Sequence, residues 1–513
     1  MVAPQVKRLG RGARPTAVLG LALVAMALLA GWQLAPAARA HGQSATSGDG
    51  SSPPLASGDP RRVGRPAVPF PCRWVPAQLS SSTGQFSPAD EASPPDTARI
   101  QAALDACAGT GRSVTLAASG NDNSFLSAPL NVHSRETLVV ADGATLYASL
   151  DPTAYQIPGG NQCGTITADA TDGCRPFIAI DGNHAGVMGT RGAKGSLGVI
   201  DGRGEMTMLG GSESWWQLAE DAHSGGNQNN PRLIQSSGAD DLTISQVELH
   251  DSPMYHILIT NGYGLTVWGV MVDTPAARAR NTDGIDPQDE SDVTLYDDMV
   301  QDGDDCVAIK SIAGLAPSSN ITVRDVHCYG THGISIGSQT GAGISNILVR
   351  DDTLSGTDSL GNVSTDDNGI RIKSDALYGG VTQQVTYHDV CMTGIKHPLY
   401  FNPHYASGGN IIPTVRDIVL NGVVAVSSAH GATSDFEGYD ADHPLQIDLE
   451  HIQLDNPAQT SDYVEAGVYN SNVIPSGPGV SVTPIQGYGS VPRCRFPSFG
   501  YPTQNGGWWQ GWH

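Results

Sequence analysis

The chain has 513 residues, with 28 Lys and Arg against 51 Asp and Glu, which gives a formal net charge of −23. Only 15% of the residues are charged, 39% are hydrophobic and 62 are Gly, a composition that excludes a coiled coil and a disordered chain. The shortage of Lys and Arg also argues against a nucleic-acid partner, because phosphate binding depends on these cations.

The first forty residues have the organisation of a secretory signal peptide. Four Lys and Arg residues lie between positions 7 and 14, an apolar run follows over 16–32, and Ala38-Arg39-Ala40 forms a small-x-small cleavage pattern. An uncleaved membrane anchor is the alternative, because the apolar run approaches the length of a membrane span. We expect residues 1–40 to be removed, which predicts a secreted protein, extracellular or periplasmic, without membrane attachment.

The composition changes after the leader. Residues 41–68 are rich in Ser, Gly and Pro and are predicted to form a flexible linker. Residues 69–513 are assigned to one catalytic domain with a C-terminal extension.

One amphipathic helix is predicted early in this domain, over 96–108. Asp96 can cap its start, Ile100 and Leu104 lie on one face, and Gly109 ends it. Such a helix needs a hydrophobic surface to cover.

Beyond the helix, short apolar runs recur with turn residues between them. One series of Val, Ile, Leu and Thr triplets begins at 242, 265, 293, 321, 347 and 385. A second series is interleaved with it over 256–260, 284–287, 306–311, 333–338, 369–374 and 398–402. Two strand series within one period of roughly 20–50 residues indicate a solenoid. Because turns rather than helices join the strands, we predict an all-β fold, a right-handed parallel β-helix whose open end is capped by the helix; a β-sandwich is the structural alternative.

Eight cysteines, an even number, fit a disulfide-bonded exported protein. Local spacing favours the pairs Cys163–Cys174 and Cys306–Cys328. There is no CxxC pair and no clustered Cys/His spacing, so we expect no zinc site.

The second strand series carries the chemically reactive residues. Its inward apolar positions align as Ile285, Val307, Ile334 and Ile370, and the residues two places earlier are Asp283, Asp305, His332 and Asn368. Equivalent positions of a solenoid stack at about 4.8 Å, so these four side chains should form one column with Asp304 beside it. Arg371 and Lys373 should project outward, because their apolar neighbours point inward.

These side chains fit the cleavage of a glycosidic bond in an acidic polysaccharide. An acid must protonate the leaving oxygen and a base must activate water. Clustered carboxylates raise the pKa of at least one member, which can then hold a proton near neutral pH, and an adjacent His can tune that proton or bind substrate. Arg and Lys beside them suit a substrate that has carboxylates of its own.

Four stretches, in order and in spacing, strongly resemble glycoside hydrolase family 28, the polygalacturonases. They are NTDGIDP (281–287), GDDCVAIKS (303–311), THGISIGS (331–338) and GIRIKS (369–374). The resemblance implies a right-handed parallel β-helix that hydrolyses pectin galacturonan with inversion. We expect a monomer that acts on pectin without a metal or another cofactor.

The resemblance implies catalytic roles for four residues. Asp304 is similar to the general acid of the family, and Asp283 and Asp305 are similar to the pair that positions and activates water. His332 resembles the histidine that supports the acid.

Four further residues are implied in substrate binding. Arg371 and Lys373 resemble a pair that grips a galacturonate carboxylate. Asn281 matches the Asn that opens the first motif, and Tyr405 is similar to a substrate-contacting tyrosine.

Other polar residues near the motifs are interpreted as structural. Isolated Asp residues in turns usually stabilise the turn, and we assign Asp286, Asp289 and Asp302 to this class. Lys310 is interpreted as part of a solenoid turn, with substrate binding as the alternative.

Two other functions fit the same architecture. A calcium-dependent lyase similar to pectate lyases would hold the cation with the clustered carboxylates and would use Arg or Lys as its base. A carbohydrate-binding solenoid without catalytic activity would bind the polymer and release no reducing ends. The column of acids with a His beside it favours the hydrolase over both.

Overall fold

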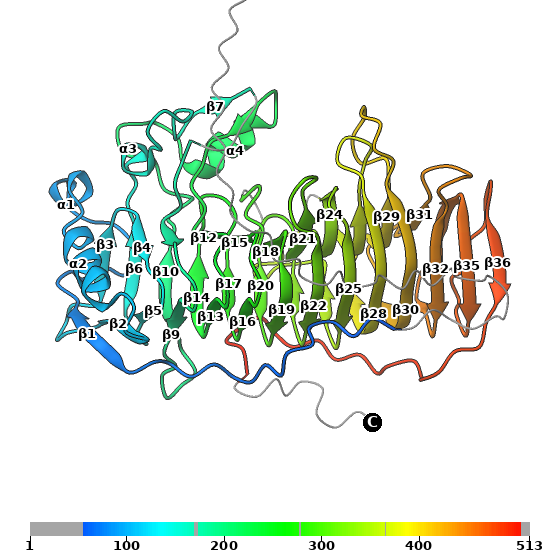
Figure 1. The fold of residues 1–513 in the computed structure, drawn as a ribbon, viewed down its shortest axis with the longest axis horizontal. Helices are drawn as coiled ribbons and strands as arrows, with labels where there is room; N and C mark the ends of the chain where they lie inside the picture. Colours follow the sequence, from blue (N-terminus) through cyan, green and yellow to red (C-terminus); the bar gives the residue numbers. More distant parts are fainter. Residues whose placement is uncertain (1–54, 169–172, 276–278, 365, 504–513) are drawn as a thin grey trace, which may run out of the picture. The chain divides into compact units, whose positions relative to one another are not determined.

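In the computed structural model, short parallel strands stack coil upon coil along one axis (Figure 1). The structure describes residues 55–168, 173–275, 279–364 and 366–503. The predicted signal peptide and the last ten residues lie outside these ranges. Within them, no helix is long and apolar enough to cross a membrane. The predicted parallel β-helix is confirmed.

One face of the coils is an eleven-stranded sheet, here called the catalytic sheet, in which each strand pairs with its neighbour in parallel register. Its strands are β4 (Leu130–Val132), β8 (Ile178–Ile180), β12 (Ile234–Ser237), β15 (Ile257–Thr260), β18 (Ile285–Gln288), β21 (Val307–Ser311), β24 (Ile334–Thr340), β27 (Asn368–Lys373), β29 (His397–Asn402), β31 (Ser434–Glu437) and β34 (Gln459–Asp462).

The other faces form two ladders that merge where strands are long enough to belong to both, as in β28 and β30. Their strands are β1 (Pro71–Pro76), β2 (Arg112–Ala117), β3 (Ser124–Ser127), β5 (Glu136–Val140), β6 (Thr145–Ala148), β9 (Gly186–Gly189), β10 (Gly198–Asp201), β13 (Thr243–Ser245), β14 (Val247–His250), β16 (Thr266–Trp268), β17 (Met271–Asp273), β19 (Ser291–Tyr296), β20 (Met299–Gln301), β22 (Ser318–Arg324), β23 (His327–Tyr329), β25 (Ile344–Arg350), β26 (Thr353–Ser355), β28 (Val381–Thr393), β30 (Thr414–Val426), β32 (Leu445–Glu450), β33 (Gln453–Leu454), β35 (Val464–Tyr469) and β36 (Ser481–Pro484).

Inward-pointing aliphatic side chains hold the coils together. In the catalytic sheet, Ile285 pairs with Val307, Val307 with Ile334, and Ile334 with Ile370, and all four are fully buried. This is the register expected from the sequence. Each coil therefore adds its apolar residues to one continuous core and removes them from water.

Asn and Asp residues bend the ladder strands at equivalent positions. Asp292, Asn320 and Asn346 lie near the starts of β19, β22 and β25, and each has a φ between +56° and +58°. Asn and Asp tolerate this left-handed conformation better than other residues with side chains. The Nδ2 atom of Asn320 donates to Oδ1 of Asp292, and Nδ2 of Asn346 donates to Oδ1 of Asn320, both at 2.8 Å.

A helix covers the first coils, as predicted. Helix α2 spans Thr97–Cys107, follows the short helix α1 (Pro88–Ala92), and packs Ile100 and Leu104, both fully buried, against β1, β2 and β4. The prediction that Asp96 caps this helix is wrong. Its buried carboxylate accepts from the backbone N–H of Leu126, at 2.7 Å, and from Arg99, and it thereby ties the helix to β3.

An N-terminal strap, residues 55–69, has no regular secondary structure but is fixed to the ladders. Ala56 N donates to Thr386 Oγ1, and Asp59 N donates to Thr322 Oγ1, both at 2.9 Å. Nearer β1, the Arg61 guanidinium donates to the carbonyl of Gly264 at 2.6 Å. The flexible linker expected over 41–68 is therefore wrong for its described part. These polar side chains satisfy backbone groups of residues hundreds of positions away.

A C-terminal strap, residues 485–503, runs back along the stack from the last coil (Figure 1). A disulfide joins Cys494 to Cys391, 103 residues earlier in the sequence. The Tyr329 hydroxyl then donates to the carbonyl of Pro497 at 2.9 Å, and Thr503 N donates to Asp297 at 3.2 Å.

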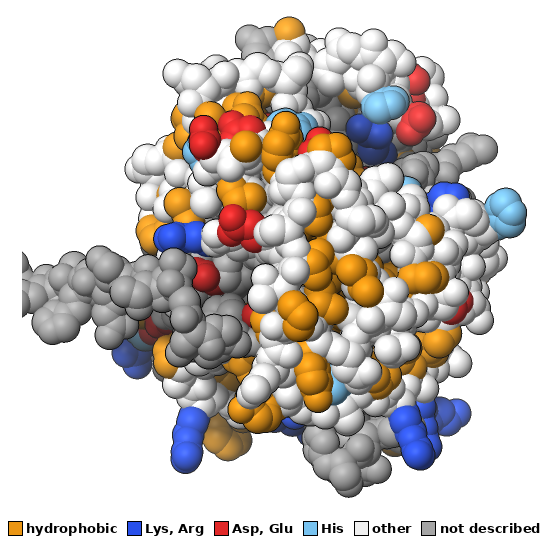
Figure 2. All heavy atoms as spheres, turned by 90° about the vertical axis from the view of Figure 1, so that its right-hand side faces the viewer, with side chains coloured by type: hydrophobic (Ala, Val, Ile, Leu, Met, Phe, Trp, Pro, Cys, Tyr) orange, Lys and Arg blue, Asp and Glu red, His pale blue; other side chains and the backbone are white. Residues whose placement is uncertain are grey.

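The end of the stack that carries the last coil is shown face on in Figure 2, where hydrophobic side chains are spread over its middle. In this coil, β36 pairs with β35 on one side only among the described residues, and all four of its residues are exposed. The two ends of the solenoid thus differ, since the N-terminal end is covered by α2.

Candidate active site

The predicted column of polar residues lies at the entry to consecutive strands of the catalytic sheet. Asp283, Asp305 and His332 precede β18, β21 and β24, and Asn368 begins β27. The same register places Tyr255 before β15 in line with them, because Ile257 pairs with Ile285. Asp304, beside the column, is 14% exposed at its side chain.

Polar contacts on several sides fix Asp304, and one of them is the Asp305 backbone N–H, which donates to its Oδ1 at 3.0 Å. The Asp304 backbone N–H donates to Oδ1 of Asp302 at 2.8 Å, and Nδ2 of Asn281 donates to the Oδ2 of Asp304 at 3.0 Å. On the next coil, Nδ1 of His332 lies 2.9 Å from its Oδ1, while the His332 backbone N–H donates to its carbonyl at 2.5 Å. The carboxylate is thus held between an amide donor and an imidazole.

Asp302 stabilises the turn that carries Asp304. It is fully buried, its Oδ1 holds the Asp304 backbone, and its Oδ2 has no hydrogen-bond partner within the described residues. Burial, opposed by the Asp304 hydrogen bond, raises the pKa of Asp302 well above its ordinary value, which favours its neutral form. Its role is to shape the turn.

Asp305 is surrounded by cations and is almost completely buried. The Arg371 guanidinium bonds to its Oδ1, Lys373 Nζ donates to its Oδ2 at 2.9 Å, and the Ser335 hydroxyl donates to Oδ1 at 2.7 Å. Arg371 is itself only 1% exposed. Arg371 points away from the core of the stack, as expected, but the Asp305 charge draws its guanidinium against the sheet.

Asp283 shares an ammonium group with Asp286. Lys310 Nζ lies 3.1 Å from Oδ2 of Asp283 and 2.5 Å from Oδ2 of Asp286, and 4.6 Å from the ring centre of Tyr255. Lys310 and Asp286 were both expected to be parts of turns. The structure places them in one ion-pair cluster with Asp283 instead. Strand alternation gave a signal for this, since Lys310 lies three positions from the inward-facing Val307 and so faces outward.

The surroundings of the three aspartates separate their pKa values. Burial and the neighbouring Asp286 raise the pKa of Asp283 well above its ordinary value, against the opposing charge of Lys310. Burial would also raise the pKa of Asp305, but Arg371 and Lys373 outweigh it and lower that pKa. Asp305 is therefore ionised, whereas Asp283 tends to keep a proton.

Asp304 and His332 share one proton between them. Burial opposes ionisation of Asp304, but the charge and the hydrogen bond of His332, followed by Lys373 and Arg371, lower its pKa. Burial likewise opposes the charge on His332, and Asp304 overcomes this and raises the histidine pKa. The expectation that crowding raises the pKa of at least one carboxylate is met by Asp283, whereas His332 lowers the pKa of Asp304.

The site opens into a cavity of about 420 Å³. Seven of the eight residues expected to form the site line this cavity, and the eighth, Arg371, lies behind them. The seven are Asn281, Asp283, Asp304, Asp305, His332, Lys373 and Tyr405. Tyr405 is 47% exposed and its ring centre lies 5.1 Å from Lys373 Nζ.

One wall of the cavity comes from α4 (Trp215–Ala222), on a loop that follows β10. An earlier loop, after β6, carries α3 (Pro152–Tyr155), and the two loops together form an excursion from the coils (Figure 1). A capping box between Ser214 and Gln217 starts α4. The antiparallel strands β7 (Ile166–Thr167) and β11 (Asn227–Gln228) brace the excursion, and Gln228 Nε2 donates to Asn281 Oδ1 at 2.8 Å. The excursion thereby orients a residue that contacts Asp304.

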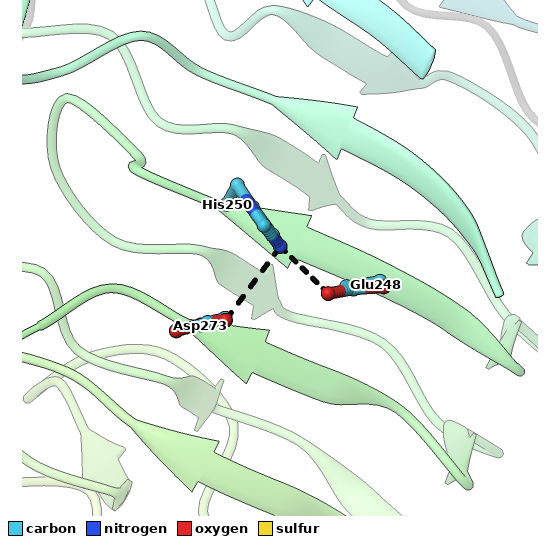
Figure 3. Close-up of side chains that lie close together, drawn as sticks. All are labelled: Glu248, His250 and Asp273. Carbon is cyan, nitrogen blue, oxygen red and sulfur yellow. Dashed lines mark hydrogen bonds and ion pairs between the residues drawn. The ribbon is translucent and has the colours of Figure 1, made fainter. Parts of the chain in front are cut away.

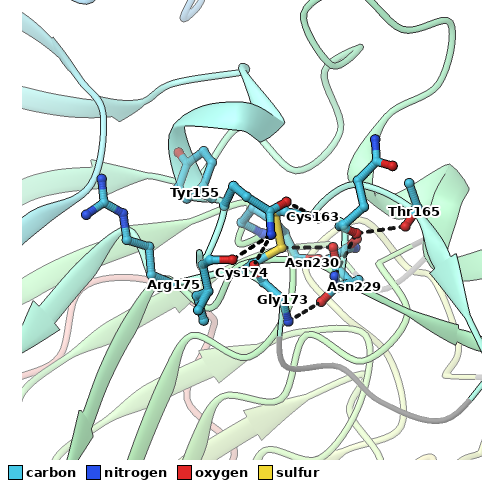
Figure 4. The surroundings of a disulfide bond; sticks show 12 residues. Tyr155, Cys163, Thr165, Gly173, Cys174, Arg175, Asn229 and Asn230 are labelled. Carbon is cyan, nitrogen blue, oxygen red and sulfur yellow. Dashed lines mark hydrogen bonds between the residues drawn. A yellow bond between two sulfur atoms is a disulfide. The ribbon is translucent and has the colours of Figure 1, made fainter. Parts of the chain in front are cut away.

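The disulfide Cys163–Cys174 closes the base of this excursion (Figure 4). Beside it, the Asn229 side chain accepts from Gly173 N at 2.9 Å and donates to the carbonyl of Gln162 at 2.7 Å. Both locally predicted disulfides are confirmed, since Cys306–Cys328 also forms, directly after Asp305. The remaining pairs are Cys72–Cys107 and Cys391–Cys494.

Three side chains of the site have donor atoms close enough together to contact one metal ion. Asp304, Asp305 and His332 each offer one atom within 4.8 Å of the others. Two cations already bond to Asp305, however, and they would repel a divalent ion. The donor set does not resemble the many-oxygen shell that calcium prefers.

A second group of a histidine and two carboxylates lies on other strands, with Glu248 and His250 on β14 and Asp273 on β17 (Figure 3). His250 Nε2 lies 2.7 Å from Glu248 and 3.8 Å from Asp273. Burial opposes the charge on His250, but the Glu248 hydrogen bond and the charges of Glu248 and Asp273 raise its pKa to about 9. His250 is therefore a cation at neutral pH, and the group is an ion-pair cluster, since metals bind neutral imidazole.

Comparison with known proteins agrees with the fold and identifies a family. A family model described as "Glycosyl hydrolases family 28" matches residues 151–470. A polygalacturonase of Ralstonia solanacearum is 34% identical over 86% of this chain and 88% of its own. An endo-polygalacturonase of Pectobacterium carotovorum subsp. carotovorum is 32% identical over 77% and 90%.

Among solved structures, the polygalacturonase from Erwinia carotovora ssp. carotovora matches with a TM-score of 0.70 at 30% identity, over 83% of this chain and 100% of its own. The chain therefore belongs to glycosyl hydrolase family 28 and is a glycoside hydrolase. The resemblance found in the four motifs is confirmed.

Proposed function

We propose that this glycoside hydrolase is a secreted, monomeric polygalacturonase that hydrolyses the α-1,4-galacturonosidic bonds of pectin with inversion. Relatives named polygalacturonase or endo-polygalacturonase match this chain over most of their length. The observation that carries the proposal is that neighbouring groups differ in protonation. Asp305 is held ionised by two cations, while the adjacent Asp304–His332 pair holds a proton.

The protonation of each aspartate determines its role in the reaction. The glycosidic oxygen approaches Asp304, and the proton held by the Asp304–His332 pair passes to it as the bond to the anomeric carbon breaks. Asp305, ionised, removes a proton from water, whose oxygen forms the new bond. Asp283, kept close to neutral by Asp286, orients that water by hydrogen bonding.

Substrate recognition uses the cations and the aromatic ring that line the cavity. Lys373 lies at the cavity wall with Tyr405 over it. An ammonium group can bind a uronate carboxylate, and an aromatic ring can pack on the apolar face of a sugar. This combination favours galacturonate over a neutral hexose.

The substitution Asp304→Asn tests the proposal. The amide cannot transfer the proton, so kcat on polygalacturonic acid should fall by about 10²–10⁴-fold, with KM changed less than threefold. Reducing ends are measured over time, and Asp442→Asn, an exposed carboxylate outside the cavity, serves as the control.

The same assay separates the alternatives. A product that absorbs in the ultraviolet and activity that is lost in chelator would identify a calcium-dependent lyase. Binding without new reducing ends in the wild-type protein would identify a non-catalytic solenoid. Proton magnetic resonance of the first-formed products determines the anomeric configuration, and retention would contradict the inverting mechanism.

A further inference from the structure

The Arg371 guanidinium has a bonding partner on each of its nitrogen atoms. Nε donates to the Ser335 hydroxyl at 2.8 Å, and Nη2 bonds to Asp305. Nη1 donates to Oδ2 of Asp366 at 2.5 Å. The residue expected to hold a substrate carboxylate therefore already binds two carboxylates of its own chain.

These two carboxylates differ in burial. Asp305 is 1% exposed at its side chain and lies within the sheet, whereas Asp366 is 46% exposed and lines the cavity. Asp366 stands on the loop before β27, five residues from Arg371. It thus covers one edge of the buried guanidinium, and because its own carboxylate is half-exposed it can rotate into solvent and uncover that edge.

We propose that Asp366 is a specificity-determining residue that occupies, on Arg371, the place of a substrate uronate carboxylate. The inference rests on the proposed function, because it concerns a galacturonate chain in this cavity. An ionised uronate that binds Arg371 must displace the Asp366 carboxylate. Two carboxylates held side by side on one guanidinium would repel each other.

Displacement weakens the binding of the acid only, and so shifts the preference of the site toward esterified galacturonate. A uronate replaces the Asp366 carboxylate with an equivalent one, so Arg371 keeps its charge-assisted bond. A methyl ester or a neutral sugar offers no such replacement and leaves Asp366 in place. Asp366 therefore lowers the affinity for ionised galacturonate and does not affect binding of the esterified form.

Binding without turnover tests this directly. Calorimetry would compare trigalacturonate and its trimethyl ester on Asp304→Asn and on the double variant Asp304→Asn/Asp366→Asn. The Asn side chain keeps the shape and the acceptor of Asp366 but not its charge. We expect the affinity for trigalacturonate to rise about fivefold and that for the ester to change less than twofold.

A second double variant, Asp304→Asn/Asp442→Asn, controls for loss of one negative charge and should change both affinities less than twofold. An unchanged or lower affinity in the Asp366 variant overturns the inference, as does an equal gain for ester and acid. The lower affinity would mean that Asp366 serves to position Arg371. Failure of the wild-type enzyme to cleave galacturonan would instead contradict the proposed function, while the affinity ratio would still decide the role of Asp366.

Discussion

At the scale of single residues, charge placement rather than crowding decides which aspartate keeps a proton. Asp283, Asp304 and Asp305 lie in one cluster and burial favours the neutral form of each, yet only the pKa of Asp283 is raised. Asp305 faces Arg371 and Lys373, and Asp304 faces His332. Cations within bonding distance outweigh desolvation, and the acid–base division follows from their positions.

The pH dependence of activity follows from the same groups. The Asp305 pKa is lowered from 3.8, so the proposed base should become protonated, and activity should fall, only in strong acid. The His332 pKa is raised from 6.5, so the shared proton is lost, and activity falls, only above that value. We predict a plateau in weak acid, measured as kcat/KM against pH. A rate that keeps rising above pH 8 would contradict this division.

Most of the site could be predicted from the sequence, and the exceptions have a common cause. Strand alternation and register place Asp283, Asp305 and His332 in one column, since both depend on backbone geometry. The burial of Arg371 against the sheet and the pairing of Lys310 with Asp286 could not be predicted. Long cationic side chains reach several partners, and their choice depends on the three-dimensional charge pattern.

At the scale of elements, the apolar strand positions and the helix were predictable because they follow fixed periods. The helix was expected over 96–108 and spans Thr97–Cys107. The N-terminal strap was missed because its composition is that of a linker. Its order comes from hydrogen bonds to distant residues such as Thr386 and Thr322, which leave no local pattern.

Helix α2 protects the first coils, and we predict that Leu104→Ala destabilises the protein by about 3 kcal/mol. Leu104 is fully buried against the core, so the truncation leaves a cavity there. Urea unfolding followed by circular dichroism measures the loss, and light scattering would detect strand edges that become exposed. Ala106→Ser, at an exposed position of the same helix, should change stability by less than about 0.5 kcal/mol. An equal effect of the two substitutions would contradict the capping role.

At the scale of the whole molecule, the disulfide Cys391–Cys494 joins the C-terminal strap to the stack across 103 residues. Removing it in Cys391→Ala/Cys494→Ala should lower the free energy of unfolding by roughly 4 kcal/mol, because the cross-link restricts a long loop of the unfolded chain. Denaturant unfolding provides the measurement. Stability equal to that of the wild type would show that the noncovalent contacts of Tyr329 and Thr503 hold the strap unaided.

A stack in which each coil contacts only its neighbours can unfold from one end, one coil after another. The N-terminal strap prevents this, because its bonds reach from β28 through β22 to the residues beside β16. Opening any coil between these points strains a segment that is anchored on both sides of the opening. Local melting therefore becomes as costly as general melting, and the hydrolase should remain fully folded until it unfolds as one cooperative unit.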